Sequence, residues 1–126
     1  MLAKTVPDHA RLSRRDKELF SNFSNIKVAV IGDVMLDTYM WGSVERISPE
    51  APVPVVALKN KEYRIGGAGN VALNTVSLGA TTTILSVIGN DDDGKQLKKL
   101  FEQNNINCNY LIESSDRLTT NKIRII

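Results

Sequence analysis

Four apolar segments of the chain have the length and composition of β-strands. Lys27–Ile31 (KVAVI) and Thr82–Ile88 are short, nearly continuous apolar runs rich in β-branched residues, and the first ends at a glycine. Such runs, without polar alternation, indicate strands that are covered on both faces. Two further strands are predicted at Tyr110–Ile112 and Lys122–Ile126.

Two segments have the capping residues and the apolar spacing of helices. Ser13 can cap a helix over Arg14–Phe23. Asn90 or Asp91 can cap a second helix that runs through Phe101. The first turn of this second helix is acidic and its later turns carry lysines, as the helix dipole favours.

A third helix is predicted within Gly66–Gly79 (GGAGNVALNTVSLG), where a glycine-rich turn precedes a stripe of small residues. Ala68, Ala72 and Val76 follow one another at four-residue intervals, so this helix can lie close against a sheet. The final glycine supplies the C-terminal stop.

The alternation of strands and helices predicts a mostly parallel α/β sheet with right-handed crossovers. In such sheets, ligands bind beyond the carboxyl ends of the strands. Asp33 and Asp37 are expected on the loop after the first strand. They and the Gly66–Asn70 turn are therefore expected to share one rim. No loop or helix follows the apolar strand at Lys122–Ile126, so the fold is expected to be incomplete at its C-terminal end.

Tyr39–Ile65 has a different character. Its three prolines cannot donate to a sheet ladder, so Val53–Leu58 is predicted to be an edge strand or an extended arm. Asn60-Lys61 is expected to turn the chain, and Glu62–Ile65 to return as a second strand. We interpret the segment as a β-ribbon that stands off the main sheet.

The composition excludes several classes of function. A chain of 126 residues fits one domain, and 42% hydrophobic with 24% charged residues is typical of a globular protein rather than a disordered one. A net charge of +2, with scattered Lys and Arg, gives no indication of binding to nucleic acid or to a membrane surface.

The scarcity of cysteine, histidine and long apolar segments leads to expectations about cellular location and metal binding. Cys108 is the single cysteine, which favours a reducing compartment. Met1–Ala10 contains no apolar run that could serve as a signal peptide, and no stretch is long enough to span a bilayer, so a cytoplasmic location is expected. Because His9 is the single histidine, a His/Cys metal site is excluded. Neither His9 nor Cys108 is assigned a catalytic role.

The Gly66-Gly67 turn suits an anionic or hydroxyl-rich ligand. Glycine allows the backbone to approach closely, and the following helix N-terminus presents free N–H groups. Asn70, in the first helical turn, can both donate to and accept from sugar hydroxyls. A plain strand-to-helix turn explains the glycines equally well.

Gly67–Ala72 also fits the dinucleotide fingerprint G-x-G-x-x-A. That fingerprint requires a buried apolar strand directly before it, and Lys59–Arg64 is a poor candidate for one. A dinucleotide-binding domain is therefore the weaker alternative. The sequence contains no P-loop motif.

Two aspartates follow the first strand. Asp37 is a suitable acceptor for two vicinal sugar hydroxyls, and we favour ligand contact for it. For Asp33 we favour a structural role in capping the following turn.

Basic residues supply the remaining candidates. Lys122 and Arg124 share one face of their strand, and such a pair can hold a phosphate group. On spacing alone, a solvated face is the better explanation. Arg46 and Arg64 pose the same question.

Together these motifs resemble those of a known family. Gly66–Asn70, with the later glycines at 79 and 89, is similar to the first signature of PfkB/ribokinase-type carbohydrate kinases. Gly32–Asp37 (GDVMLD) resembles the family's opening motif. Ile47–Val55 (ISPEAPVPV) is similar to the heptose kinases of the family, which phosphorylate D-glycero-β-D-manno-heptose 7-phosphate at C1 on the route to ADP-heptose and the lipopolysaccharide core. Gly69 departs from these heptose kinases, which usually carry alanine there.

The resemblance implies a ribokinase-like α/β fold, with a mostly parallel sheet flanked by helices and a protruding β-ribbon lid. It divides the chain into an N-terminal helix (1–25), a lid ribbon (39–65) that often makes a homodimer contact, and an α/β body (26–38 and 66–126). The substrate-binding residues that it implies are Asp37, Gly66, Gly67, Asn70, Lys122 and Arg124. Two possible further contacts to a substrate phosphate are Arg46 and Arg64.

The resemblance also implies a catalytic aspartate in a later Gly-Ala-Gly-Asp turn. There the carboxylate accepts the proton of the attacking hydroxyl, while N–H groups and Mg²⁺ stabilise the transferring phosphoryl group. No such turn occurs in this sequence, and Asn70 cannot act as a base. ATP and Mg²⁺ are therefore implied as cofactors whose sites lie mostly outside the chain, and the chain alone is expected to have no kinase turnover. A non-catalytic sugar-binding or dimerisation module is the alternative.

Overall fold

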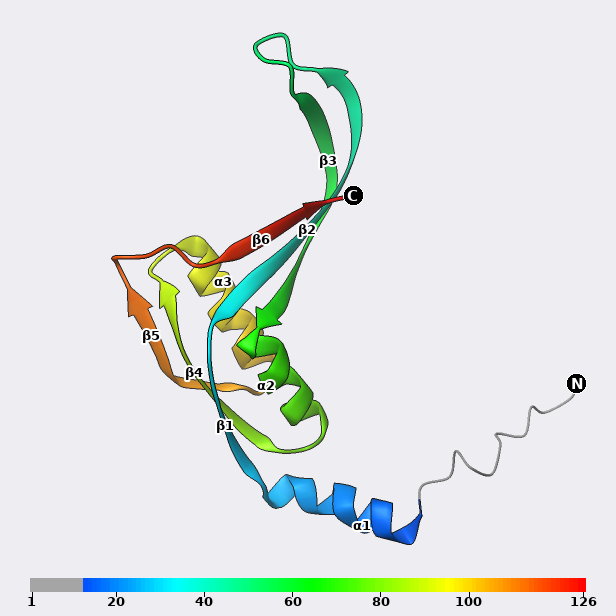
Figure 1. The fold of residues 1–126 in the computed structure, drawn as a ribbon, viewed down its shortest axis with the longest axis vertical. Coiled ribbons are helices and arrows are strands. Elements are labelled where there is room, and N and C mark those ends of the chain that lie inside the picture. Colours follow the sequence, from blue (N-terminus) through cyan, green and yellow to red (C-terminus); the bar gives the residue numbers. More distant parts are fainter. Residues whose placement is uncertain (1–12) are drawn as a thin grey trace, which may run out of the picture.

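The computed structural model describes residues 13–126 of the chain (Figure 1). The expectations about Met1–Ala10 and His9 lie outside the described residues. Within residues 13–126, no helix combines the length and the apolar character that crossing a bilayer requires.

The N-terminal helix α1 (Arg14–Asn22) begins where predicted and continues into a 3₁₀ turn, η2 (Phe23–Asn25). The Ser13 hydroxyl accepts a hydrogen bond from the Asp16 N–H, and the Asp16 carboxylate accepts one from the Ser13 N–H, which closes a capping box. The helix lies at one end of the molecule, away from the sheets (Figure 1).

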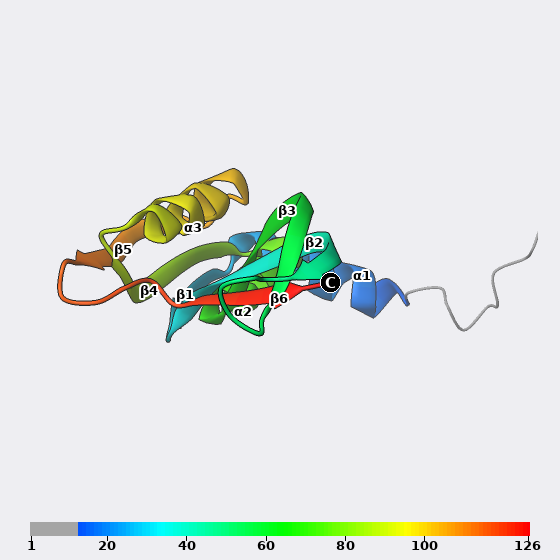
Figure 2. The same cartoon turned by 90° about the horizontal axis from the view of Figure 1, so that it is seen from above.

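The body of the molecule is a parallel sheet in the order β1-β4-β5. Its strands are β1 (Lys27–Ile31), β4 (Thr81–Gly89) and β5 (Asn107–Ser114). The helix α2 (Ala68–Ser77) precedes β4, and α3 (Asp92–Gln103) connects β4 to β5. Seen from above, α3 lies along β4 and β5 (Figure 2). These elements confirm the predicted parallel α/β sheet, whereas the predicted strand Lys122–Ile126 belongs to a second sheet and not to this body.

Of the two helices of the body, α3 begins and α2 ends at the predicted residues. Asp91, rather than Asn90, caps α3, because its carboxylate accepts a hydrogen bond from the Gly94 N–H at 2.7 Å. Gly79 follows α2 with a φ of 102°, a conformation that favours glycine.

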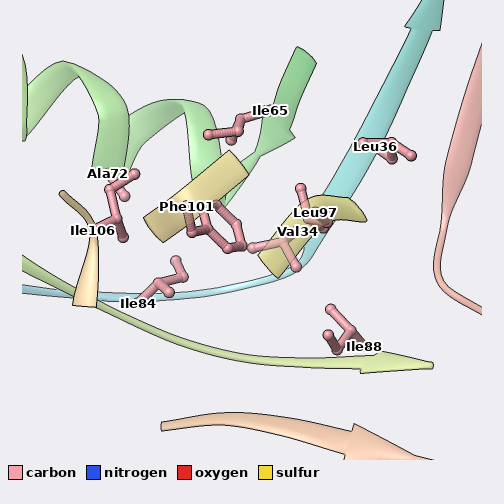
Figure 3. Close-up of a cluster of buried hydrophobic side chains, with 9 residues drawn as sticks. All are labelled: Val34, Leu36, Ile65, Ala72, Ile84, Ile88, Leu97, Phe101 and Ile106. Atoms are coloured by element: carbon pink, nitrogen blue, oxygen red, sulfur yellow. The ribbon is translucent and has the colours of Figure 1, made fainter. Parts of the chain in front are cut away.

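Side chains from both helices and from three strands meet in one apolar core (Figure 3). Ala72 of α2 is fully buried, and Ala68 and Val76 pack against the core, which confirms the small-residue stripe. The buried members of the cluster are Val34, Leu36, Ile65, Ala72, Ile84, Ile88, Leu97, Phe101 and Ile106.

Gly69 lies where α2 meets α3. A Cβ at this position would be 2.5 Å from Cγ2 of Ile65 and 2.8 Å from Cε1 of Phe101. The Phe101 ring therefore occupies the space that an alanine methyl group would need.

Helices cover one face of the body sheet among the described residues. On the other face, residues 85–87 of β4 line a hollow of about 450 Å³ together with residues of β1 and β5. Ile31, Tyr110 and Ile112 are each more than 60% exposed there. Within residues 13–126, the prediction that the strands are covered on both faces is therefore wrong.

A long antiparallel ribbon stands off the body (Figure 1). It consists of β2 (Val34–Ile47) and β3 (Pro54–Gly67), and β6 (Asn121–Ile125) pairs in parallel with the other edge of β2. The sheet order β3-β2-β6 confirms that the proline-containing strand is an edge strand. The ribbon is longer than the predicted 39–65 at both ends.

The ribbon reverses at a different place from the one predicted. β3 is continuous, and the chain turns at residues 48–53, so the predicted turn at Asn60-Lys61 is wrong. Two of the prolines lie in this reversal and the third begins β3, where a missing N–H is tolerated. Near the predicted turn, Lys59 is accommodated as an extra residue in the pairing with β2, which is a β-bulge.

Asp37 lies within β2 rather than on the predicted loop. β1 ends at Ile31 and β2 begins at Val34, so the connection between them is only two residues long. The physical reason is burial: Val34 and Leu36 both enter the core, and this period-two pattern starts the strand directly after the turn.

Candidate functional site

Charged and aromatic side chains cover the face of β2 that points away from the core. Leu36 and Thr38 are fully buried, so Asp37 and Tyr39, which alternate with them, point to the opposite face. With their neighbours on β3 and β6 they form a set that we call the charged face: Asp37, Tyr39, Glu62, Arg64, Lys122 and Arg124.

Asp37 is the centre of the charged face. Its Oδ1 atom accepts a hydrogen bond from Nη1 of Arg124 at 2.8 Å and lies 3.2 Å from Nζ of Lys122. The Asp37 side chain is only 16% exposed, whereas both cations are more than one-third exposed. Lys122 and Arg124 thus lie on one strand face, as predicted, and their charges meet at Asp37.

These contacts decide the protonation state of Asp37. Burial would raise the pKa of its carboxyl group, but the hydrogen bonds and positive charges of Arg124 and Lys122 outweigh this effect and hold the pKa below its ordinary value. The carboxylate is therefore ionised at neutral pH and can only accept hydrogen bonds. Because Oδ1 is occupied by the two cations, Oδ2 is the oxygen left to accept from a ligand.

Gly66 lies against this second oxygen. A Cβ on Gly66 would be 2.7 Å from Oδ2 of Asp37 and 2.8 Å from Cγ of Met35, closer than real Cβ atoms approach. Gly67 has a φ of 61°, and its Cβ would be 2.5 Å from the carbonyl oxygen of Asp33. Packing and backbone conformation alone therefore require both glycines.

Asp33 ties the short β1–β2 connection to α2. Its carbonyl oxygen accepts a hydrogen bond from the N–H of Ala68, the first residue of the helix, at 2.8 Å. The backbone makes this contact, which any residue could supply, so the structural role of the Asp33 side chain stays a prediction.

Asn70 lies on the other side of β3. It is exposed, and it lines a hollow of about 260 Å³ whose other lining residues are Tyr63, Arg64, Ile65, Leu73, Leu100 and Asn104. Ile65 pairs with the buried Leu36, so this hollow is on the core-facing side of the ribbon, whereas Asp37 points to the opposite side. Joint binding of one ligand by Asp37 and Asn70 therefore stays a prediction.

The structure brings Arg64 to the charged face and places Arg46 far from it. Arg64 is directly opposite Asp37 in the ribbon register, and its Nε atom donates to Oε1 of Glu62 at 2.5 Å. Arg46 lies near the ribbon tip, roughly 30 Å further along β2 at the usual rise per residue of a strand.

Tyr39 and Glu62 are not among the site residues predicted from the sequence. The signal was a period-two pattern, because Asp37, Tyr39 and Trp41 share one face once the strand is taken to begin at Val34. Placing Asp37 on a loop concealed this pattern.

The dinucleotide alternative gains no support from the topology. The fingerprint belongs to a βαβ unit whose two strands lie in one sheet. In this structure β3, which precedes the glycine-rich helix, is in the ribbon sheet, and β4, which follows it, is in the body sheet.

Comparison with known sequences gives matches of two kinds. The family model described as "pfkB family carbohydrate kinase" matches residues 25–126. A relative named bifunctional protein HldE, from Geobacter sulfurreducens, is 46% identical over 116 residues, which cover 91% of this chain and 24% of that protein. The protein of the same name from Coxiella burnetii is 42% identical over 111 residues, covering 88% of this chain and 23% of that protein. The chain thus spans about a quarter of the length of these relatives.

Comparison with solved structures shows the fold. A carbohydrate kinase from Agrobacterium tumefaciens superposes with a TM-score of 0.63 at 24% identity, over 80% of this chain and 31% of that one. Ribokinase from Cryptococcus neoformans gives a TM-score of 0.57 at 22% identity, over 78% of this chain and 30% of that one. These matches confirm the predicted ribokinase-like α/β fold.

Proposed function

We propose a function for this chain from the premise that it belongs to the pfkB family of carbohydrate kinases. The chain is the sugar-holding, N-terminal part of an ATP-dependent kinase that phosphorylates D-glycero-β-D-manno-heptose 7-phosphate at C1, a step towards ADP-heptose and the lipopolysaccharide core. The choice of this heptose is supported by the resemblance of Ile47–Val55 to heptose kinases and by the relatives named bifunctional protein HldE.

The observation that carries the proposal is the carboxylate of Asp37, which two cations hold ionised against Gly66. In this proposal, Oδ2 of Asp37 accepts hydrogen bonds from sugar hydroxyls, and Gly66 and Gly67 let the sugar approach the backbone closely. Asn70 contributes an amide from the other side of the turn.

Lys122 and Arg124 provide charge for the phosphate of the substrate. An ammonium group has three N–H donors and a guanidinium group has five, so contact with Asp37 leaves further donors on both residues. They can therefore bind a phosphate oxygen without releasing Asp37. Arg64 is a further proposed contact from the same face, and Arg46 a contact that would require the ribbon tip to approach.

ATP, Mg²⁺ and the catalytic base are assigned to the rest of the parent protein. Within residues 13–126, no group of three His, Cys, Asp or Glu side chains is arranged to hold a metal ion, and the sequence has no Gly-Ala-Gly-Asp turn. To the residues of this chain we assign the binding and orientation of the sugar. We place the parent in the cytoplasm, where ATP is available.

The ribbon is proposed to act as a lid and as a homodimer contact. Its apolar residues Val44, Ile47, Val53 and Leu58 are each more than half exposed. The same surface favours a second candidate function, a non-catalytic dimerisation module. Light scattering after size-exclusion chromatography tests the contact: Ile47→Ser should convert a dimer to a monomer. A stable dimer whose parent has no sugar kinase activity would favour the module.

Steady-state kinetics of the parent kinase test the main proposal. Asp37→Asn keeps the shape of the side chain but removes the negative charge that strengthens hydrogen bonds from the sugar hydroxyls. Since a hydrogen bond to a charged group contributes about 1.5–3 kcal/mol, we expect KM for heptose 7-phosphate to rise about 10- to 150-fold. Asp116→Asn, on an exposed loop, is the matched control and should leave KM unchanged.

Two results would contradict the proposal. One is an Asp37→Asn variant with the KM of the wild type, and the other is a parent that does not phosphorylate heptose 7-phosphate. The 126-residue chain alone should show no turnover with ATP.

A further inference from the structure

We propose that Tyr39 is a positioning residue that holds the guanidinium groups of Arg64 and Arg124 in place to bind the phosphate of the substrate. The inference rests on the proposed function and identifies the part of the charged face that recognises the phosphate.

Tyr39 has an arginine from each neighbouring strand at its ring. The guanidinium carbon of Arg64 is 4.5 Å from the ring centroid, and that of Arg124 is 5.0 Å from it. Both distances are within the roughly 6 Å at which a cation is attracted to an aromatic ring. The strand register explains the arrangement, because Arg124 is directly opposite Tyr39 on β6 and Arg64 is its diagonal neighbour on β3.

Each arginine is also held at a second point. Nε of Arg64 donates to Glu62 at 2.5 Å, and Nη1 of Arg124 donates to Asp37 at 2.8 Å. Two guanidinium groups beside one ring repel each other. The attraction of the Tyr39 ring and of the two carboxylates is therefore needed to keep both groups in place. Each guanidinium group is held by one nitrogen and by the ring, so its plane has a fixed orientation. Its unused N–H donors therefore keep fixed directions.

Trp41 fixes the orientation of the Tyr39 ring. The two rings are stacked, with centroids 5.9 Å apart and planes inclined by 20°. Both residues are on the same face of β2, two positions apart, which is the spacing that brings strand side chains side by side. Trp41 thus limits the tilt of the ring that the arginines contact.

The chemistry of the charged face matches a phosphate monoester. Its three cations exceed its two carboxylates, so one positive charge is left to attract an anion. Guanidinium groups bind phosphate oxygens in pairs through their planar fork of donors, which requires a fixed plane. A flexible pair of arginines would lose side-chain entropy on binding, and Tyr39 removes part of that cost beforehand.

Kinetics of the parent kinase with three substitutions test this role. Tyr39→Ile and Tyr39→Leu remove the ring, and isoleucine is well suited to a strand. Loss of two exposed cation–π contacts should raise KM for heptose 7-phosphate about 5- to 30-fold, with kcat changed by less than about twofold. Tyr39→Phe keeps the ring and should restore KM to within about twofold of the wild type.

Inorganic phosphate provides a readout that does not involve the sugar. Its inhibition constant against heptose 7-phosphate should rise by the same factor as KM in the two ring-less variants. Lys61→Met is the matched control, since it removes a cation 4.8 Å from the Tyr63 ring on the other side of the ribbon, and it should change neither constant.

The outcomes separate this inference from the proposed function. If both ring-less variants keep the KM and the phosphate inhibition constant of the wild type, the inference is wrong and the proposed function stands. If KM rises but the phosphate inhibition constant does not, Tyr39 contacts the sugar and does not position the arginines. If the wild type does not prefer heptose 7-phosphate over the unphosphorylated heptose, the proposed function itself fails.

Discussion

The body and the ribbon of this molecule are stabilised by different means. The body buries an apolar cluster between its sheet, its two helices and the first residues of β2. From residue 39 to residue 62 the described ribbon has no buried side chain, so it depends on backbone pairing, aromatic stacking and ion pairs. The charged face lies where the two regions meet. Substitutions in the body should therefore reduce stability, whereas substitutions on the charged face should change ligand affinity.

Phe101→Ala should produce the largest loss of stability. The ring is fully buried at the centre of the core, and removing such a side chain costs about 3–5 kcal/mol. Urea unfolding should show this loss, while the control Val44→Ala on the exposed ribbon should change the free energy of unfolding by less than about 0.5 kcal/mol. Similar losses from both substitutions would contradict the distinction between body and ribbon.

Gly69→Ala should have an intermediate effect. The new methyl group meets Ile65 and Phe101, and overpacking of this kind costs about 1–3 kcal/mol, partly offset by the better helix propensity of alanine. Urea unfolding of the double variant Gly69→Ala/Phe101→Leu should reveal coupling, because the smaller side chain makes room for the methyl group. Additive effects of the two substitutions would show that the ring does not oppose the alanine.

The pH dependence of stability should show the smallest effect. Hydrogen bonding from the Thr119 N–H, at 2.7 Å, and from the Gly94 N–H lowers the pKa of Asp91 despite its partial burial. A lowered folded-state pKa stabilises the protein above the unfolded value, about 3.9, and this contribution is lost as the pH falls through the folded-state pKa. Asp91→Ala should therefore cost about 1–2 kcal/mol at pH 7 and progressively less below about pH 4.

Unfolding titrations at several pH values check this expectation. For Asp37, whose pKa is also lowered, the same sign applies. Its partners are exposed, so Asp37→Asn should cost less than about 1 kcal/mol at pH 7. A larger loss of stability for Asp37→Asn than for Asp91→Ala would contradict the view that the body determines stability and the charged face determines ligand affinity.

The body could be predicted from the sequence because its signals are local. The apolar run Lys27–Ile31, the capping residue Asp91 and the small-residue stripe around Ala72 each determine their element through neighbouring residues. The sequence of the strands could not predict which faces of the sheet are covered, because that depends on the other chain segments that pack against each face.

The ribbon could not be predicted in detail because its geometry is set by pairing across strands. Asn60-Lys61 has the composition of a turn, yet pairing with β2 continues past it, and a bulge at Lys59 absorbs the irregularity. The residue types at Asp37 and Arg124 pointed to ligand binding, but their contact joins positions 87 residues apart. No local pattern contains that contact. Tyr39 was missed for a different reason, because placing Asp37 on a loop concealed the period-two pattern of the strand face.

The two irregular places in the ribbon have a mechanical consequence. Pairing shifts by one residue at Lys59 on β3 and again at Glu45 on β2, both beyond the charged face, and bulges bend and twist a strand locally. The tip lies about 20 Å past Gly42, so a small change of angle there would displace the tip much further than the residues next to the bulge. Val34 and Leu36 anchor the base in the core. Bending at these two places would thus move the outer part of the ribbon, while the base that carries Asp37 keeps its shape.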